Sequence, residues 1–108
     1  PIQVGIPVGF VVRVSRAGQP VTDLQPYLGA AAHVIALDAQ AGGFSHIHGV
    51  AGDRPPVDAM GDMAAPPAAF GPTVAFSHQF AKPGLYKVWA QFAPRGQVIT
   101  VAWVVEVR

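Results

Sequence analysis

The chain has 108 residues, of which 51% are hydrophobic and only 12% are charged, and its net charge is +1. This length indicates one domain, residues 1–108, with a real core, and the composition excludes a disordered chain. The near-neutral charge excludes nucleic acid as an expected partner. The absence of cysteine excludes disulfides, thiolate ligands and thiol catalysis. No apolar run approaches the roughly 18 residues of a membrane helix, so direct membrane insertion is not expected.

The hydrophobic pattern predicts strands along the chain and a sustained helical period nowhere. In the first strand, within residues 2–15, alternate positions are apolar and share one face, namely Val8, Phe10, Val12 and Val14. Further strands are predicted at residues 33–38, 44–48, 74–80, 85–92 and 97–107. Turns containing Gly or Pro separate them, and residues 49–72 are predicted to form one long loop. This pattern predicts an all-β domain, an immunoglobulin-like Greek-key β-sandwich of about seven strands.

One tyrosine has the sequence context of a structural corner. Tyr86 follows Pro83-Gly84-Leu85 and opens a strand late in the chain. In immunoglobulin-like sandwiches, a tyrosine near such a turn donates its hydroxyl to nearby backbone. The pattern favours a tyrosine corner, and the alternative is an ordinary half-buried aromatic residue.

The segment His46-Ile47-His48 carries the clearest chemistry of the chain. Alternate residues of a strand share a face, with Cα atoms about 6.6 Å apart. The two imidazoles can therefore lean together and reach one metal ion. The alternative is two hydrogen-bonded or solvated polar residues at the end of a strand.

All four histidines are predicted to face the core, because each shares its strand face with large apolar residues: His33, His46, His48 and His78. A buried imidazole must hydrogen-bond or bind something, since an unpaired buried polar group costs about 1–3 kcal/mol. Four of them on three neighbouring strands predict a shared metal site. If Ile47 faces the core instead, His46 and His48 point to solvent and the predicted cluster breaks up. His33 could also stand apart, at the opposite end of the sandwich.

Two methionines lie in the predicted long loop, in the segment Asp58-Ala59-Met60-Gly61-Asp62-Met63. Thioethers are soft ligands that favour Cu(I), whereas imidazoles suit Cu(II) and Zn(II). Met60 and Met63 are therefore candidate copper ligands, and the alternative is that they pack the loop onto the sandwich. Asp58 and Asp62 either support such a site or keep the loop soluble.

No enzyme activity is predicted from the motifs. The sequence has no nucleophile elbow and no phosphate loop, and no carboxylate stands close to a histidine as in a triad or a zinc hydrolase. Asp38 and Glu106 are predicted to point outward from their strands. A small metallo-enzyme with an open coordination position is a third interpretation, for which the sequence names no convincing acid or base.

Three segments together resemble a group of bacterial domains. They are residues 20–30 with Pro-Tyr-Leu-Gly, residues 44–48 with His-x-His, and residues 71–92 with Pro-Gly-x-Tyr. The chain is similar to short exported immunoglobulin-like or cupredoxin-like domains, loosely to YtkA-like and CopC-like periplasmic proteins, which occur beside copper-handling modules. The resemblance implies a periplasmic or extracellular location and a link to heavy-metal handling. It implies as metal ligands His33, His46, His48 and His78.

The sequence thus predicts an exported β-sandwich that binds or carries a transition metal through a histidine cluster. Copper, as Cu(II) or Cu(I), is the expected ion and zinc the second choice; a metal-transport or membrane protein is an expected partner. The alternative is an immunoglobulin-like structural or interaction module of a larger exported protein, without a metal site. Because the chain begins at Pro1 without Met, we expect that a signal peptide or neighbouring domain has been removed. Outward-facing apolar residues indicate a surface that a second copy could cover, giving a homodimer: Trp89, Val98, Ala102 and Val104.

Overall fold

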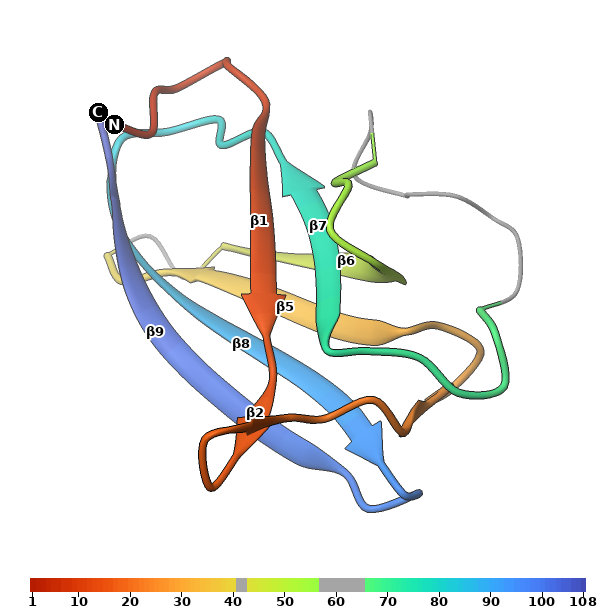
Figure 1. Ribbon diagram of the computed structural model, residues 1–108. Coiled ribbons are helices and arrows are strands. Elements are labelled where there is room, and N and C mark those ends of the chain that lie inside the picture. Colours follow the sequence, from red (N-terminus) through yellow and green to blue (C-terminus); the bar gives the residue numbers. More distant parts are fainter. Residues whose placement is uncertain (41–42, 57–65) are drawn as a thin grey trace.

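A computed structural model describes residues 1–40, 43–56 and 66–108 and shows an all-β domain (Figure 1). In these residues the strands are β1 (Val8–Arg13), β2 (Ser15–Arg16), β3 (Gln19–Pro20), β4 (Leu24–Gln25), β5 (Ala32–Asp38), β6 (Phe44–Ala51), β7 (Thr73–His78), β8 (Gly84–Pro94) and β9 (Ile99–Val107). The described residues include no helix long and apolar enough to cross a membrane. The predicted all-β class is confirmed.

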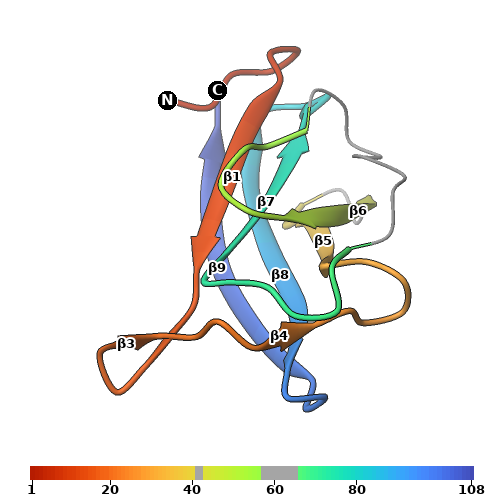
Figure 2. The ribbon, with the colours of Figure 1, turned by 45° about the vertical axis from the view of Figure 1, so that its right-hand side comes forward.

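Strands β5 to β8 form a Greek key. Strand β8 returns to lie beside β5, so the spatial order is β8-β5-β6-β7. Strand β1 continues the sheet beside β7, and β9 continues it beside β8. All of these pairings are antiparallel. The predicted Greek-key sandwich is therefore confirmed, with β1 and β7 in one layer and β5, β8 and β9 in the other (Figure 2).

Strand β6 belongs to both layers. It pairs with β5 as far as Gly49, and then Val50 and Ala51 pair with β7. Gly49 permits this change of partner, because a Cβ there would lie 3.0 Å from the Cβ of Ala32 and 3.4 Å from the carbonyl oxygen of Ala75. The prediction that a loop begins at residue 49 is wrong, because backbone pairing with β7 extends the strand through Ala51.

The core combines small side chains on β5 with aromatic side chains on the segment around β7. Val34 and Ala36 pack in one buried cluster with Phe76 and Phe80. Strand β9 has its less exposed face on alternate residues from Ile99 to Val107, and Ala102 and Val104 face outward as the sequence predicts. The inner face of β1 follows its predicted alternation in the same way.

The facing of β5 and β6 is opposite to the prediction. Val34 is fully buried and Ile47 is 1% exposed, so the alternate residues His33, His46 and His48 point outward. The aromatic rings of the opposite layer fill the core and leave space on β5 for small side chains only. The large residues Ile35 and Leu37 of β5 consequently lie on the outer face, whereas the sequence pattern predicted that they face the core.

Asp38 shares the buried parity of β5, so its predicted outward position is also wrong. The side chain lies at the end of the strand, and its Oδ1 accepts a 2.8 Å hydrogen bond from the backbone amide of Gln40. Glu106 is exposed, as predicted. The buried carboxylate thus ends β5 at a turn.

Tyr86 forms the predicted tyrosine corner. Its hydroxyl donates a 2.9 Å hydrogen bond to the carbonyl of Lys82, and its ring packs against Phe80 with centroids 4.7 Å apart. Burial raises the pKa of the Tyr86 hydroxyl, and the nearby Asp38 carboxylate raises it further. The neutral hydroxyl therefore remains a donor throughout the neutral pH range.

Replacing Tyr86 by Phe should lower the free energy of unfolding by about 1 kcal/mol, because one buried hydrogen bond is lost while the ring remains. Urea denaturation followed by tryptophan fluorescence measures this change. The control is Tyr27→Phe, the same change at a half-buried residue outside the core clusters, which should change stability by less than about 0.5 kcal/mol. Equal losses in the two variants would refute the corner's special role.

Candidate metal centre

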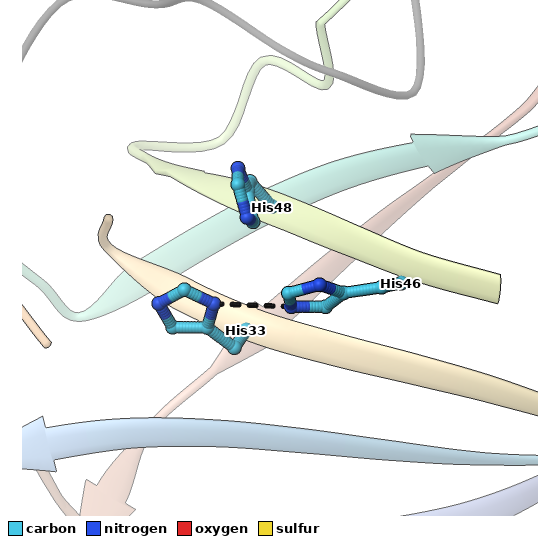
Figure 3. A group of neighbouring side chains, drawn as sticks. All are labelled: His33, His46 and His48. Atoms are coloured by element: carbon cyan, nitrogen blue, oxygen red, sulfur yellow. Dashed lines mark hydrogen bonds between the residues drawn. The ribbon is translucent and has the colours of Figure 1, made fainter. Parts of the chain in front are cut away.

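Three of the four histidines meet on the outer face of the sheet (Figure 3). His46 and His48 lie two residues apart on β6 and so share its outer face. His33 lies on β5 directly opposite His48 in the strand register. Directly opposed side chains of antiparallel strands are close neighbours, so the pairing of β5 with β6 brings the three rings together.

The three rings are in mutual contact. The centroid of the His33 ring lies 5.4 Å from that of His46 and 5.0 Å from that of His48, and the His46 and His48 centroids lie 4.9 Å apart. Each ring offers one nitrogen such that the three nitrogens lie within 4.8 Å of one another. His46 is exposed and the other two are half-buried. The cluster is therefore accessible from solvent.

Hydrogen bonds fix the orientation of His33. Its Nε2 lies 2.8 Å from the backbone carbonyl oxygen of Tyr27, and because a carbonyl only accepts, Nε2 carries the proton and donates it. In the neutral ring Nδ1 is then an unprotonated acceptor. Nδ1 lies 3.2 Å from Nε2 of His46, which donates to it. His33 thus presents a lone pair to the middle of the cluster.

This arrangement matches what a metal ion requires of imidazole ligands. A ligating histidine commonly donates its second ring nitrogen to a backbone carbonyl, which fixes the ring and its tautomer. Two nitrogens bound at about 2.0 Å in tetrahedral geometry lie about 3.3 Å apart, close to the 3.2 Å between His33 and His46. An ion bound to both nitrogens would replace the proton that they share, and His48 offers a third nitrogen within 4.8 Å of the other two rings' ligand atoms.

Burial lowers the pKa of His48, and repulsion from His33 and then from His46 lowers it further. The ring is consequently neutral at pH 7, which is the form that binds metals. A protonated imidazole has no free lone pair, so proton binding and metal binding at a ring nitrogen compete with each other. The cluster is therefore suited to a cation above the acidic range.

A tight turn holds the carbonyl that orients His33. Tyr27 and Ala30 exchange two backbone hydrogen bonds of 2.9 and 3.1 Å. The two residues between them, Leu28 and Gly29, both have positive φ, at 51° and 82°, as a type I′ turn requires. The Tyr27 ring also meets the His33 ring edge-on, with centroids 5.5 Å apart. The sequence analysis identified this Pro-Tyr-Leu-Gly segment but not its role in orienting His33. The sequence feature that could have indicated this role is Gly29, a turn-forming residue just before the strand that carries His33.

His78 does not join the cluster. It follows the predicted inward parity of β7 and packs edge-on against Phe80, with ring centroids 4.6 Å apart. Its Nδ1 is buried and has no hydrogen-bond partner among the described residues. The prediction that all four histidines face the core is therefore wrong for three of them, and the cluster forms because His33 also faces outward. Met60 and Met63, the other candidate ligands, lie outside the described residues.

The whole chain, residues 1–108, matches the model of a family described as a domain of unknown function (DUF8832), and the chain belongs to that family. No curated protein and no solved structure matches the chain significantly. The histidine cluster, which is close enough to hold a metal ion, therefore carries the functional argument.

His78 should make stability depend on pH. Burial lowers its pKa, so on acidification the unfolded state takes up the proton first. Above about pH 6.5, the pKa of histidine in the unfolded chain, His78 is neutral in both states and the free energy of unfolding is not reduced. Below that pH the free energy of unfolding falls, by no more than about 1.4 kcal/mol per pH unit. Urea denaturation at pH 8, 6.5 and 5 should show wild type losing more stability than His78→Leu. Parallel losses in the two proteins would contradict this assignment.

Proposed function

We propose that the protein binds a transition metal ion reversibly through His33, His46 and His48 and carries or buffers that ion outside the cytoplasm. The observation that supports this proposal most is the convergence of three imidazoles on an exposed face, one of them oriented by the Tyr27 carbonyl. These three rings contact one another at the surface, whereas the Nδ1 of His78 is buried apart from them. The periplasmic or extracellular location rests on the resemblance of the sequence to exported domains.

Copper is the proposed ion, with zinc as the second choice. Neutral imidazole nitrogens without a thiolate suit Cu(II) and Zn(II), and Cu(II) has the higher affinity for such ligands. The thioethers of Met60 and Met63 would let the same site hold Cu(I) if they reach the cluster, and their role as ligands remains a prediction. A metal-transport or membrane protein would then supply or receive the ion.

Reversible binding fits this site better than catalysis. His46 is exposed and the rings stand on an outer sheet face, so an ion can enter and leave without a conformational change of the fold. The three-residue group contains no carboxylate that could act as an acid or base on a bound water. The proposed role is accordingly a carrier, and no bond chemistry is assigned.

Replacing His46 and His48 together by Ala should weaken Cu(II) binding at least about 100-fold, because one imidazole cannot chelate an ion. Competition with a chromophoric chelator at pH 7.5 measures the affinity, and circular dichroism checks that the fold survives. His78→Leu is the matched control and should bind Cu(II) as wild type does. The site assignment fails if the double variant keeps its affinity or if His78→Leu loses it.

An interaction module is the second candidate function, and the exposed apolar residues of the outer face favour it. Phe44 on β6, Leu85 on β8 and Val104 on β9 are 70%, 51% and 61% exposed. Their strands belong to the same sheet, in which β5 lies between β6 and β8, and β9 follows β8. Several exposed large apolar side chains on one sheet face favour a protein contact. The proposed partner is a second copy of the chain.

Light scattering at about millimolar concentration should then show a dimer, which Phe44→Ser should shift towards monomer. The matched control is Val11→Ser on β1, where another exposed apolar residue lies in the other layer. A wild-type protein that stays monomeric at this concentration would count against the interaction module and leave the metal site untouched.

A further inference from the structure

A cavity of about 290 Å³ lies directly beside the histidine cluster, and His33 and His46 form part of its wall. Its remaining lining residues are Leu28, Ile35, Trp89, Gln91 and Thr100. The volume is close to the lower end of the range for small-molecule sites. The cavity therefore has room for a compact molecule in contact with two of the three candidate ligands.

Three of the residues that line the cavity beside the histidines are large and apolar. Ile35 lies beside Trp89 in the pairing of β5 with β8, and Ile35 is 41% exposed. Leu28 is 75% exposed at the tip of its turn, with a positive φ that glycine or asparagine adopts more easily. A strained, exposed leucine at a cavity rim gains from covering a ligand. These three side chains suit an apolar ring or a branched chain.

An ion held by the three histidines would keep a coordination position free, beside a cavity that two of its ligands line. Three protein ligands leave the fourth position of a four-coordinate ion to water or to an added molecule. His48 does not line the cavity, whereas His33 and His46 do. The cavity therefore lies on the side of the cluster where these two rings meet.

Charge selects the headgroup of the ligand. Three neutral imidazoles leave a divalent ion with its full charge, and the Lys87 ammonium lies 5.0 Å from the centroid of the Trp89 ring. No carboxylate is among the lining residues. Gln91 donates a 3.2 Å hydrogen bond to the Thr100 hydroxyl, and this hydroxyl, with the second amide hydrogen of Gln91, can donate to an acceptor. The positive charge of the ion and these hydrogen-bond donors favour an anion.

We propose that the metal-loaded site binds a small carboxylate with an apolar body, its oxygen taking the open position and its body filling the cavity. This inference rests on the proposed metal binding and goes further by naming the ligand class. Benzoate has both the carboxylate headgroup and an apolar body, whereas acetate has the headgroup without an apolar ring. Comparing the two anions therefore separates the affinity due to the headgroup from the affinity due to the apolar body.

The test is a titration of the Cu(II)-loaded full chain with benzoate and with acetate, followed by the visible absorption and electron paramagnetic resonance of the ion. Benzoate should bind at least about tenfold more tightly than acetate, because only benzoate buries apolar surface against the cavity wall. Equal affinities, or no spectral change with either anion, would overturn the inference while leaving metal binding intact. A chain that takes up no Cu(II) would overturn the proposed function itself.

A pair of variants locates the ligand. Leu28→Asn keeps a residue that tolerates positive φ and removes the apolar rim, so benzoate affinity should fall about three- to tenfold while acetate and Cu(II) affinities stay unchanged. Val104→Asn changes an exposed valine of the same face that does not line the cavity and should have no effect. Equal losses in the two variants, or none in Leu28→Asn, would place benzoate elsewhere and overturn the assignment.

Discussion

The register between β5 and β6 is the constraint on which the site depends. It sets His33 opposite His48 on the outer face and buries Val34 opposite Ile47 on the inner face. A slip of one residue would turn every side chain of the strand over, which would bury the imidazoles and expose the core residues. The hydrophobic cost of exposing those residues therefore holds the histidine cluster in place.

The same strands connect the site to the rest of the fold. Strand β6 leaves β5 after Gly49 and joins β7, so the strand that carries two of the histidines also links the two layers. The third histidine is oriented from outside the sheet, by the backbone of the Tyr27–Ala30 turn. A rigid sheet and a tight turn together place the rings without using side chains from the core. The site can consequently stay open to solvent while the core remains closed.

The fold could be predicted from the sequence because alternation and turn residues recur along the chain, and Tyr86 fell in a recognisable corner. The facing of β5 could not, because both of its faces are apolar and the larger residues, Ile35 and Leu37, lie on the outer one. Only the opposing aromatic layer decides which face is buried. The sequence did predict that His33, His46 and His48 belong to one site. The reason given was that all of them face the core, whereas in the structure they share the outer face. His78 has the predicted inward parity and stands apart for that reason.

Calorimetric titration of the metal-stripped protein with Cu(II), and then with Zn(II), at neutral pH is the decisive test of metal binding by the histidine cluster. Because three imidazoles on one face can share a single ion, the account predicts one ion per chain with about micromolar affinity or tighter. Heat at that stoichiometry would establish a specific site. No binding of Cu(II) or Zn(II), followed by no binding of Cu(I), would contradict the account and make the three histidines a structural feature of the outer face.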